Sequence, residues 1–255
     1  MEASIVGKIY EEHQGVRVWR ICHSGFLITY RDIVLIIDPA IEIAGDDPLI
    51  SEHSERIRLL KELPVLARDL RRVDIVLVSH ADEDHSGSKS LTTLEQKTHV
   101  FVGTPEAAGK FRAIGIPAAK IREAYFDEPI FYGELRIIPT EAHHLLPRGC
   151  SCGYLIDTPA GRIWYPGDSI ILPGHYEIRS PDILLLPIAK HVFGAEQGGR
   201  FADRIRAQHI IPCHYGTYEG TSGWRFGDVD LLKENVENPD ERLHLLDLGE
   251  MFHYG

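Results

Sequence analysis

Two histidines and three acidic residues occupy the six positions from His80 to His85, within the segment VSHADEDHSG (78–87). The apolar run VDIVLV (73–78) leads into them and is typical of a buried strand. His80 and Asp82 lie two residues apart, so an extended backbone points both to the same side. Imidazole and carboxylate groups together suit Zn, Mn or Fe. A metal site and a solvated acidic turn are the two readings of this segment.

Four other positions also carry histidine or aspartate at the end of a predicted strand. Asp38 follows IVLII, His143 and His144 follow LRIIPTEA, Asp168 follows RIWYPG, and His214 follows HIIPC. Strand ends that meet at one edge of a sheet bring residues that are distant in sequence close together. The repetition of this placement favours a metal site over a solvated turn.

Hydrophobic periodicity and turn residues predict the strands and helices that position these residues. Each half of the chain shows hairpins followed by alternating strands and helices, which predicts mixed sheets flanked by helices. We expect one domain over residues 1–255, in which the halves pack sheet to sheet with helices outside. Strands are expected at 16–21, 25–30, 33–39, 73–78, 98–103, 181–189 and 209–216, and hairpins at 130–140 and 153–169. Helices are expected at 49–72, with a break near Pro64, and at 90–96, 104–115 and 199–209.

Composition narrows the class of protein. The formal net charge is −11 and there is no long basic run, which argues against nucleic acid as a partner because such binding depends on clustered Lys and Arg. The apolar runs are shorter than the ~20 residues of a membrane span. The N-terminus MEASIVGKIYEEHQG does not resemble a signal peptide, so we expect a cytoplasmic protein. A small-molecule substrate is the expected partner, and the sequence leaves a homo-oligomer open.

The ligand candidates resemble the metallo-β-lactamase superfamily. Its loop, His-x-His-x-Asp-His after a buried strand, corresponds here to His80-Ala81-Asp82-Glu83-Asp84-His85. A single His, an Asp in a Gly-Asp-Ser/Thr context and a last His follow in the same order. The likeness is greatest to the UlaG-like, lactonase-like branch, because of His23-Ser24-Gly25, Ile37-Asp38-Pro39, Tyr165-Pro166-Gly167-Asp168 and Ile211-Pro212-Cys213-His214-Tyr215.

The resemblance implies an α/β fold, a four-layer αββα sandwich with two divalent metal ions (Zn, Mn or Fe) at the sheet edge. It implies a metal-dependent hydrolase that uses a metal-bound hydroxide on a small ester, lactone or phosphodiester. Asp84 and Asp168 would be the catalytic carboxylates. His144 is preferred to His143 as the third ligand because the family often reads Ala-x-His there. The implied ligands are His80, Asp82 and His144 for one metal, Asp84, His85 and His214 for the other, and Asp168 as a bridge.

Asp82 departs from the family loop, which has histidine at this position. Two divalent ions formally carry four positive charges, which three carboxylates and a bridging hydroxide would neutralise. A less positive site lowers the pKa of bound water less. An oxygen ligand also shifts metal preference from Zn toward the harder Mn or Fe. A site with one metal is the other possible consequence of this substitution.

Residues around the predicted site have less specific roles. Asp38 could hold a metal-binding histidine in place, or it could cap the Asp-Pro turn. His23 could contact substrate or be a buried structural histidine. Glu83 is expected to point away from the metals, and Lys190 and His191 to lie near the substrate. Specificity would reside in the loops 143–152, 190–199 and 215–228.

Other classes of protein fit parts of this pattern. A nuclease of the same superfamily is disfavoured by the acidic charge. A non-catalytic binding protein would need broken ligands, yet Asp82 can still coordinate a metal. An iron enzyme of the superfamily would show a one-metal site or an added flavin domain. A metal-dependent hydrolase is therefore the function that the sequence predicts.

Overall fold

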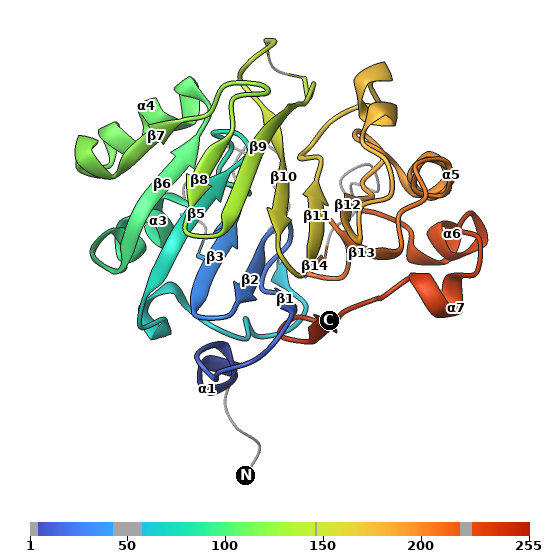
Figure 1. Cartoon of the computed structure of the whole chain (residues 1–255), viewed down its shortest axis with the longest axis horizontal. Helices are drawn as coiled ribbons and strands as arrows, with labels where there is room; N and C mark the ends of the chain where they lie inside the picture. The colour runs from blue at the N-terminus through green and yellow to red at the C-terminus, as the bar shows by residue number, and fades with distance from the viewer. Residues whose placement is uncertain (1–4, 43–57, 146, 220–225) are drawn as a thin grey trace. The chain divides into compact units, whose positions relative to one another are not determined.

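The computed structural model describes residues 5–42, 58–145, 147–219 and 226–255. The chain divides into two compact units. Unit 1 comprises Met1–Glu123, Thr217–Thr221 and Asp247–Gly255, and unit 2 comprises Ala124–Gly216 and Ser222–Leu246. Each unit is built on one main sheet with its own helices (Figure 1).

The main sheet of unit 1 has the strand order β15-β1-β2-β3-β5-β6-β7. The strands from β15 to β3 pair antiparallel, and those from β3 to β7 pair parallel. The carboxyl ends of β3 and β5 therefore lie side by side at one edge. The bounds are β1 (Val16–Arg20), β2 (Phe26–Tyr30), β3 (Ile33–Ile37), β5 (Val73–Val78), β6 (Thr98–Gly103), β7 (Ile121–Glu123) and β15 (Met251–Tyr254). A separate two-stranded sheet pairs β4 (Arg58–Leu59) with β14 (Tyr218–Glu219).

Helices pack on one face of this sheet. They are α1 (Ile5–Ile9), α3 (Ser88–Leu94) and α4 (Pro105–Ala113), with 3₁₀ turns at Ala67–Asp69, Glu95–Lys97 and Ala118–Lys120. Leu91, Leu94 and Phe111 join Val76 and Val78 of β5 in one buried core. Every residue of β5 is buried, as a predominantly apolar run predicts for a central parallel strand.

The sheet of unit 2 has the order β13-β12-β11-β10-β9-β8. β8 to β11 pair antiparallel, and β11 to β13 pair parallel. The strands β9, β11, β12 and β13 consequently run in the same direction and end at the same edge. The bounds are β8 (Ile130–Tyr132), β9 (Leu135–Glu141), β10 (Cys152–Thr158), β11 (Gly161–Tyr165), β12 (Ile183–Pro187) and β13 (His209–Cys213).

Unit 2 has its own apolar core on the helical side of the sheet. Its helices are α5 (Ala195–Arg204), α6 (Val229–Glu234) and α7 (Pro239–Arg242), with a 3₁₀ helix at Pro173–Glu177. Trp164 of β11, Leu186 of β12 and Phe201 of α5 pack together there and are fully buried. The Trp164 and Phe201 rings lie 5.8 Å apart between centroids. This core fixes the strands whose ends carry the candidate ligands.

The helical segment predicted over 49–72, with a break near Pro64, is wrong for residues 58–72, and residues 49–57 lie outside the described residues. Residues 58–72 hold β4, an irregular stretch and a 3₁₀ turn. Pro64 lacks an amide hydrogen and disfavours a continuous helix, while Val65 and Leu70 reach the core from irregular backbone. The helices of the described residues are all too short or too polar to cross a membrane.

Candidate metal centre

Asp38 organises the end of the unit 1 sheet where β3 and β5 finish side by side. Its amide donates to Leu77 O at 2.8 Å, which continues the parallel pairing of the two strands. Its φ of 47° turns the chain out of the strand. The carboxylate accepts the Ser79 amide and the Ser79 hydroxyl, both at 2.7 Å. Asp38 is fully buried, so these bonds compensate its lost hydration.

The same carboxylate determines which nitrogen of two histidines carries the proton. His85 Nδ1 lies 2.8 Å from Asp38 Oδ2 and donates to it. Ser79 gives its only hydroxyl proton to Asp38, so its oxygen accepts from His80 Nδ1 at 2.9 Å. Both imidazoles thus carry hydrogen on Nδ1, which leaves the Nε2 lone pairs for a metal. This geometry corresponds to the histidine-holding role considered for Asp38, rather than to a turn cap alone.

His80, Asp82 and His85 lie together in unit 1. The His80 and His85 rings are 4.1 Å apart between centroids and tilted by 44°. His80 Nε2 lies 3.4 Å from Asp82 Oδ2, as their spacing of two residues predicts. Both histidines are fully buried, whereas the Asp82 side chain is 40% exposed. His80 therefore lies between the two other candidates, with the Asp82 carboxylate beside its Nε2 and the His85 ring beside its own ring.

Asp84 and His23 make other contacts within unit 1. The main-chain oxygen of Asp84 accepts the Ser24 hydroxyl at 2.6 Å. This bond ties the loop from His80 to His85, called the metal loop below, to the turn after β1. Among the described residues of this unit, no ion pair links the Asp84 carboxylate to His80 or His85. His23 is buried and packs against Tyr218, with ring centroids 5.4 Å apart. The roles predicted for Asp84 and His23 stay predictions.

Lys110 of α4 holds the metal loop from the helical side. Its ammonium group donates to Glu83 Oε2 at 2.7 Å, Ser86 Oγ at 2.6 Å and Ala81 O at 2.9 Å. Glu83 also accepts the Ser88 amide at 2.6 Å, so its carboxylate turns toward α3 and α4. Burial alone would raise the pKa of Glu83, but the bonds from Lys110 and Ser88 outweigh it and lower the pKa below its ordinary value.

Replacing Lys110 by methionine is expected to lower the free energy of unfolding by about 1–3 kcal/mol at neutral pH, because it leaves a largely buried carboxylate without its cation. Since the folded-state pKa of Glu83 is lowered from its ordinary value of 4.5, the contact stabilises the fold above that pH. Its contribution is lost as the pH falls through the folded-state pKa. Urea unfolding of wild type and variant at pH 7 and pH 4 measures this. Lys120→Met, which removes the Lys120–Glu95 pair, is the matched control. An undiminished difference on acidification would contradict the assignment.

Unit 2 brings four candidate ligands to the edge where β9, β11, β12 and β13 end. His144 follows β9, Asp168 follows β11, His191 follows β12, and His214 directly follows β13. Asp168 Oδ1 lies 3.1 Å from His214 Nε2, and Asp168 Oδ2 lies 3.7 Å from His191 Nε2. The ring of His191 is 5.3 Å from that of His144 and 6.4 Å from that of His214. Parallel strand direction explains how residues 70 positions apart converge.

His144 and His143 occupy different environments in this unit. His144 is buried beside His191, whereas His143 is exposed. The His143 amide donates to Ser169 Oγ at 2.9 Å, and its carbonyl accepts the Ile170 amide at 3.0 Å. These two bonds tie the loop after β9 to the loop after β11. The preference for His144 over His143 as a metal ligand stays a prediction.

In unit 2, left-handed backbone conformations at Gly167 and His214 orient the Asp168 carboxylate and the His214 imidazole. Gly167 has a φ of 67°, and a Cβ there would lie 2.5 Å from Cys152 O. His214 has a φ of 64°, and its carbonyl accepts the Gly227 amide at 2.8 Å. Non-glycine residues in this region are strained and cluster at functional sites. Asp168 and His214 therefore owe their orientation to specific turns after β11 and β13.

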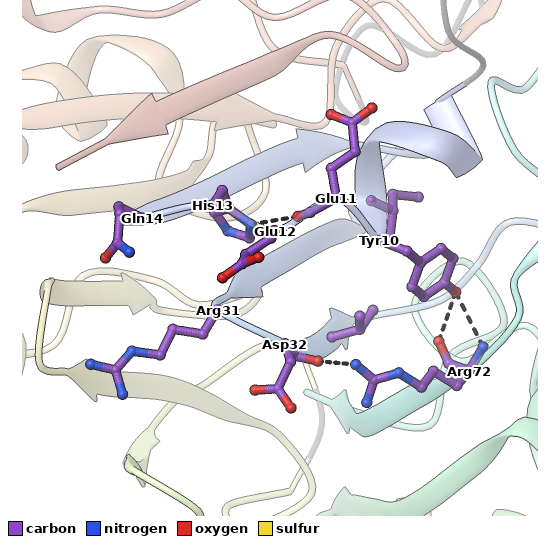
Figure 2. A pocket seen from close by; sticks show the side chains of 10 residues that line it. Tyr10, Glu11, Glu12, His13, Gln14, Arg31, Asp32 and Arg72 are labelled. Carbon is purple, nitrogen blue, oxygen red and sulfur yellow. Dashed lines mark hydrogen bonds between the residues drawn. The ribbon is translucent and has the colours of Figure 1, made fainter.

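A separate hollow of about 500 Å³ lies at the opposite end of the unit 1 strands, near the start of β3 and β5. Figure 2 shows Tyr10 bonded to the backbone of Arg72, and the Arg72 side chain reaching the carbonyl of Asp32. His13 Nδ1 lies 3.1 Å from Glu11 O. These contacts join the N-terminal segment to the sheet, so the hollow has a structural explanation.

The two groups fit divalent metal ions. In unit 2 the possible ligand atoms of His144, Asp168 and His191 all lie within 4.8 Å of one another. In unit 1 the proton positions leave Nε2 of His80 and His85 as acceptors, and Asp82 Oδ2 lies 3.4 Å from His80 Nε2. Buried nitrogen and carboxylate donors of this kind suit Zn, Mn or Fe. Two groups of such donors at buried strand ends are typical of a metal-binding α/β protein.

The chain belongs to the β-lactamase superfamily domain family, whose model matches residues 35–215. It is 25% identical over 201 residues to a metal-dependent hydrolase from Pyrobaculum calidifontis, covering 77% of this chain and 82% of that protein. The metallo hydrolase Igni18 from Ignicoccus hospitalis has a similar structure, with a TM-score of 0.71, 21% identity and coverage of 95% and 100%. So does an isothiocyanate hydrolase from Delia radicum gut bacteria, with a TM-score of 0.75, 18% identity and coverage of 93% and 99%.

These likenesses confirm the predicted superfamily and the α/β metallo-β-lactamase fold with its two sheets. The relative from Pyrobaculum calidifontis also bears the class name that the sequence predicted, metal-dependent hydrolase. The sequence predicts His191 only near the substrate, whereas the structure groups it with His144 and Asp168. It carried the same signal as the predicted ligands, a histidine shortly after a buried strand.

Proposed function

We propose that the chain is a metal-dependent hydrolase of small esters, lactones or phosphodiesters, of the UlaG-like, lactonase-like branch. It would use two divalent ions, Zn, Mn or Fe. The matched family region spans all the proposed ligands. As the resemblance implies, these would be His80, Asp82 and His144 for one ion, Asp84, His85 and His214 for the other, and Asp168 for both.

The observation that carries this proposal is the convergence of ligand-type side chains within each unit. In unit 2, His144, Asp168 and His214 come from three strand ends to one edge, with Asp168 3.1 Å from His214. In unit 1, His80, Asp82 and His85 come together on one loop. A non-catalytic descendant would have little reason to keep buried, oriented donors in both units, because burying them is costly.

The residues of the chain would bind and orient, while the metals supply Lewis acidity. Bound divalent ions lower the pKa of water and polarise a carbonyl or phosphoryl oxygen. Asp38 holds His85, and through Ser79 also His80, with their Nε2 atoms free of hydrogen. The buried carboxylate of Asp168 supplies negative charge beside His214. Asp82, partly exposed, reduces the positive charge of the site relative to the histidine of the family loop and favours the harder ions of the set.

Elemental analysis with a substrate panel tests the proposal. Purified wild type is expected to hold about two equivalents of Zn, Mn or Fe, and to hydrolyse lactones, aryl esters or phosphodiesters only with metal. His85→Ala is expected to hold at most about one equivalent. His99→Ala, which removes an exposed histidine of unit 1, is the matched control and is expected to keep both.

Other outcomes of this experiment identify the rival functions. Cleavage of RNA or DNA without turnover of small substrates would indicate the nuclease. A metal-loaded protein without hydrolysis of any panel member would indicate a binding protein. A chain that takes up no metal after reconstitution would overturn the proposal.

A further inference from the structure

We propose that His191 is a metal ligand, bound to the same ion as His144. This assignment rests on the proposed function only in that a divalent ion binds in unit 2. It adds an imidazole that the family loop and its downstream positions do not supply.

In unit 2 the distance between His191 and Asp168 fits two ligands of one metal ion better than it fits a direct hydrogen bond. His191 Nε2 lies 3.7 Å from Asp168 Oδ2, which is too long for a hydrogen bond. Two ligands about 2.0–2.1 Å from a tetrahedral zinc ion lie about 3.3 Å apart, so only a small adjustment separates this pair from coordination. The possible ligand atoms of His144, Asp168 and His191 lie within 4.8 Å of one another. An ion between them accounts for all three positions.

The backbone around His191 is rigid enough to present a ligand. Ile188 donates to Cys213 O at 3.3 Å, so the segment after β12 stays attached to β13. The amides of Val192 and Gly194 then both donate to Ala189 O, at 3.1 and 3.0 Å, and close a tight turn around His191. Phe193 is buried and stacks on His175, with ring centroids 5.6 Å apart. The turn is thus anchored on both sides of the imidazole.

The number of histidine ligands gives a chemical reason for the additional imidazole of His191. The family motif supplies five histidines, and this chain has four at those positions because Asp82 replaces one. His191 restores the number to five without adding charge. An added neutral nitrogen ligand would strengthen zinc and cobalt binding relative to manganese and offset the preference introduced by Asp82.

Cobalt substitution tests the assignment without measuring activity. His191→Cys is expected to show a cobalt–thiolate charge-transfer band in the near ultraviolet on addition of Co²⁺, because residue 191 would bond the ion directly. Lys190→Cys, which places a thiol on the adjacent exposed residue, is the matched control and is expected to resemble wild type. Wild type contributes its own four cysteines as the baseline.

Zinc affinity, measured by competition with a chelator, provides the second readout. His191→Ala is expected to bind zinc at least about tenfold more weakly than wild type, while Lys190→Ala is unchanged. Circular dichroism of each metal-free variant shows whether it is folded. No thiolate band in folded His191→Cys, with zinc affinity unchanged in His191→Ala, would overturn the role of His191 while wild type still binds metal. Failure of wild type itself to bind metal would instead overturn the proposed function, and this assignment with it.

Discussion

Asp168→Asn is expected to reduce hydrolysis by about a thousandfold and to lower the bound metal to one equivalent or less. The carboxylate lies 3.1 Å from His214 and 3.7 Å from His191, so its charge is central to the unit 2 ligands. A bound ion stabilises the transition state by several kcal/mol, and about 4 kcal/mol corresponds to a factor of about a thousand in rate. Steady-state hydrolysis and elemental analysis of the two proteins measure both effects.

The same substitution is expected to leave the metal-free protein at least as stable as wild type. Asp168 is only 2% exposed, and burying a neutral amide costs less than burying a carboxylate. Thermal unfolding in EDTA separates loss of the site from loss of the fold. Full activity and full metal content in Asp168→Asn would contradict the proposed role of this residue.

Asp38→Asn is expected to weaken metal binding by about 10–100-fold, although Asp38 itself need not touch a metal. The amide of asparagine would face His85 Nδ1 with hydrogens, and would favour the tautomer that carries its proton on Nε2. That tautomer has no lone pair for a metal at Nε2. Asparagine tolerates the left-handed conformation seen at φ 47°, so the turn after β3 is expected to persist. Metal titration of the metal-free variant measures the affinity.

Asp38→Ala is expected to cost more stability, about 3–5 kcal/mol, because the Ser79 amide, the Ser79 hydroxyl and His85 Nδ1 lose a buried acceptor. Asp74→Asn is the matched control, since Asp74 is also a buried carboxylate of this unit. It accepts the Val34 amide at 2.8 Å at the opposite end of the strands. It is expected to lower stability but not metal affinity. Equal metal affinity in the Asp38 and Asp74 variants would show that Asp38 does not position the ligands.

Local sequence determined most of the elements of this protein. The strands predicted at 73–78 and 98–103 coincide with β5 and β6, because β-branched runs bounded by turn residues suit buried parallel strands. Thr104 followed by proline predicted the start of α4, and its hydroxyl accepts the Ala107 amide at 3.3 Å. The predicted helix over 58–72 failed because leucine spacing does not distinguish a helix from a loop whose apolar residues reach the core.

Sequence order also indicated which side chains end up at the strand ends, and so which residues could do chemistry. It predicted that Asp38, Asp168 and His214 follow strands, as they do, and that His80 and Asp82 point the same way. These statements depend only on local periodicity and on the direction of each strand. They do not depend on which strand is the neighbour of which.

The tertiary structure alone decided how those side chains are oriented. The burial of His144 and the exposure of the adjacent His143 accompany two bonds that tie the loop after β9 to the loop after β11. The hold of Asp38 on Ser79 and His85 follows from the pairing of β3 with β5, across 41 and 47 residues of sequence. His191 joins His144 and Asp168 because β12 lies beside β11 and ends at their edge. Strand ends are a local property of the chain, whereas the partners that orient a side chain there are set by strand order and loop packing.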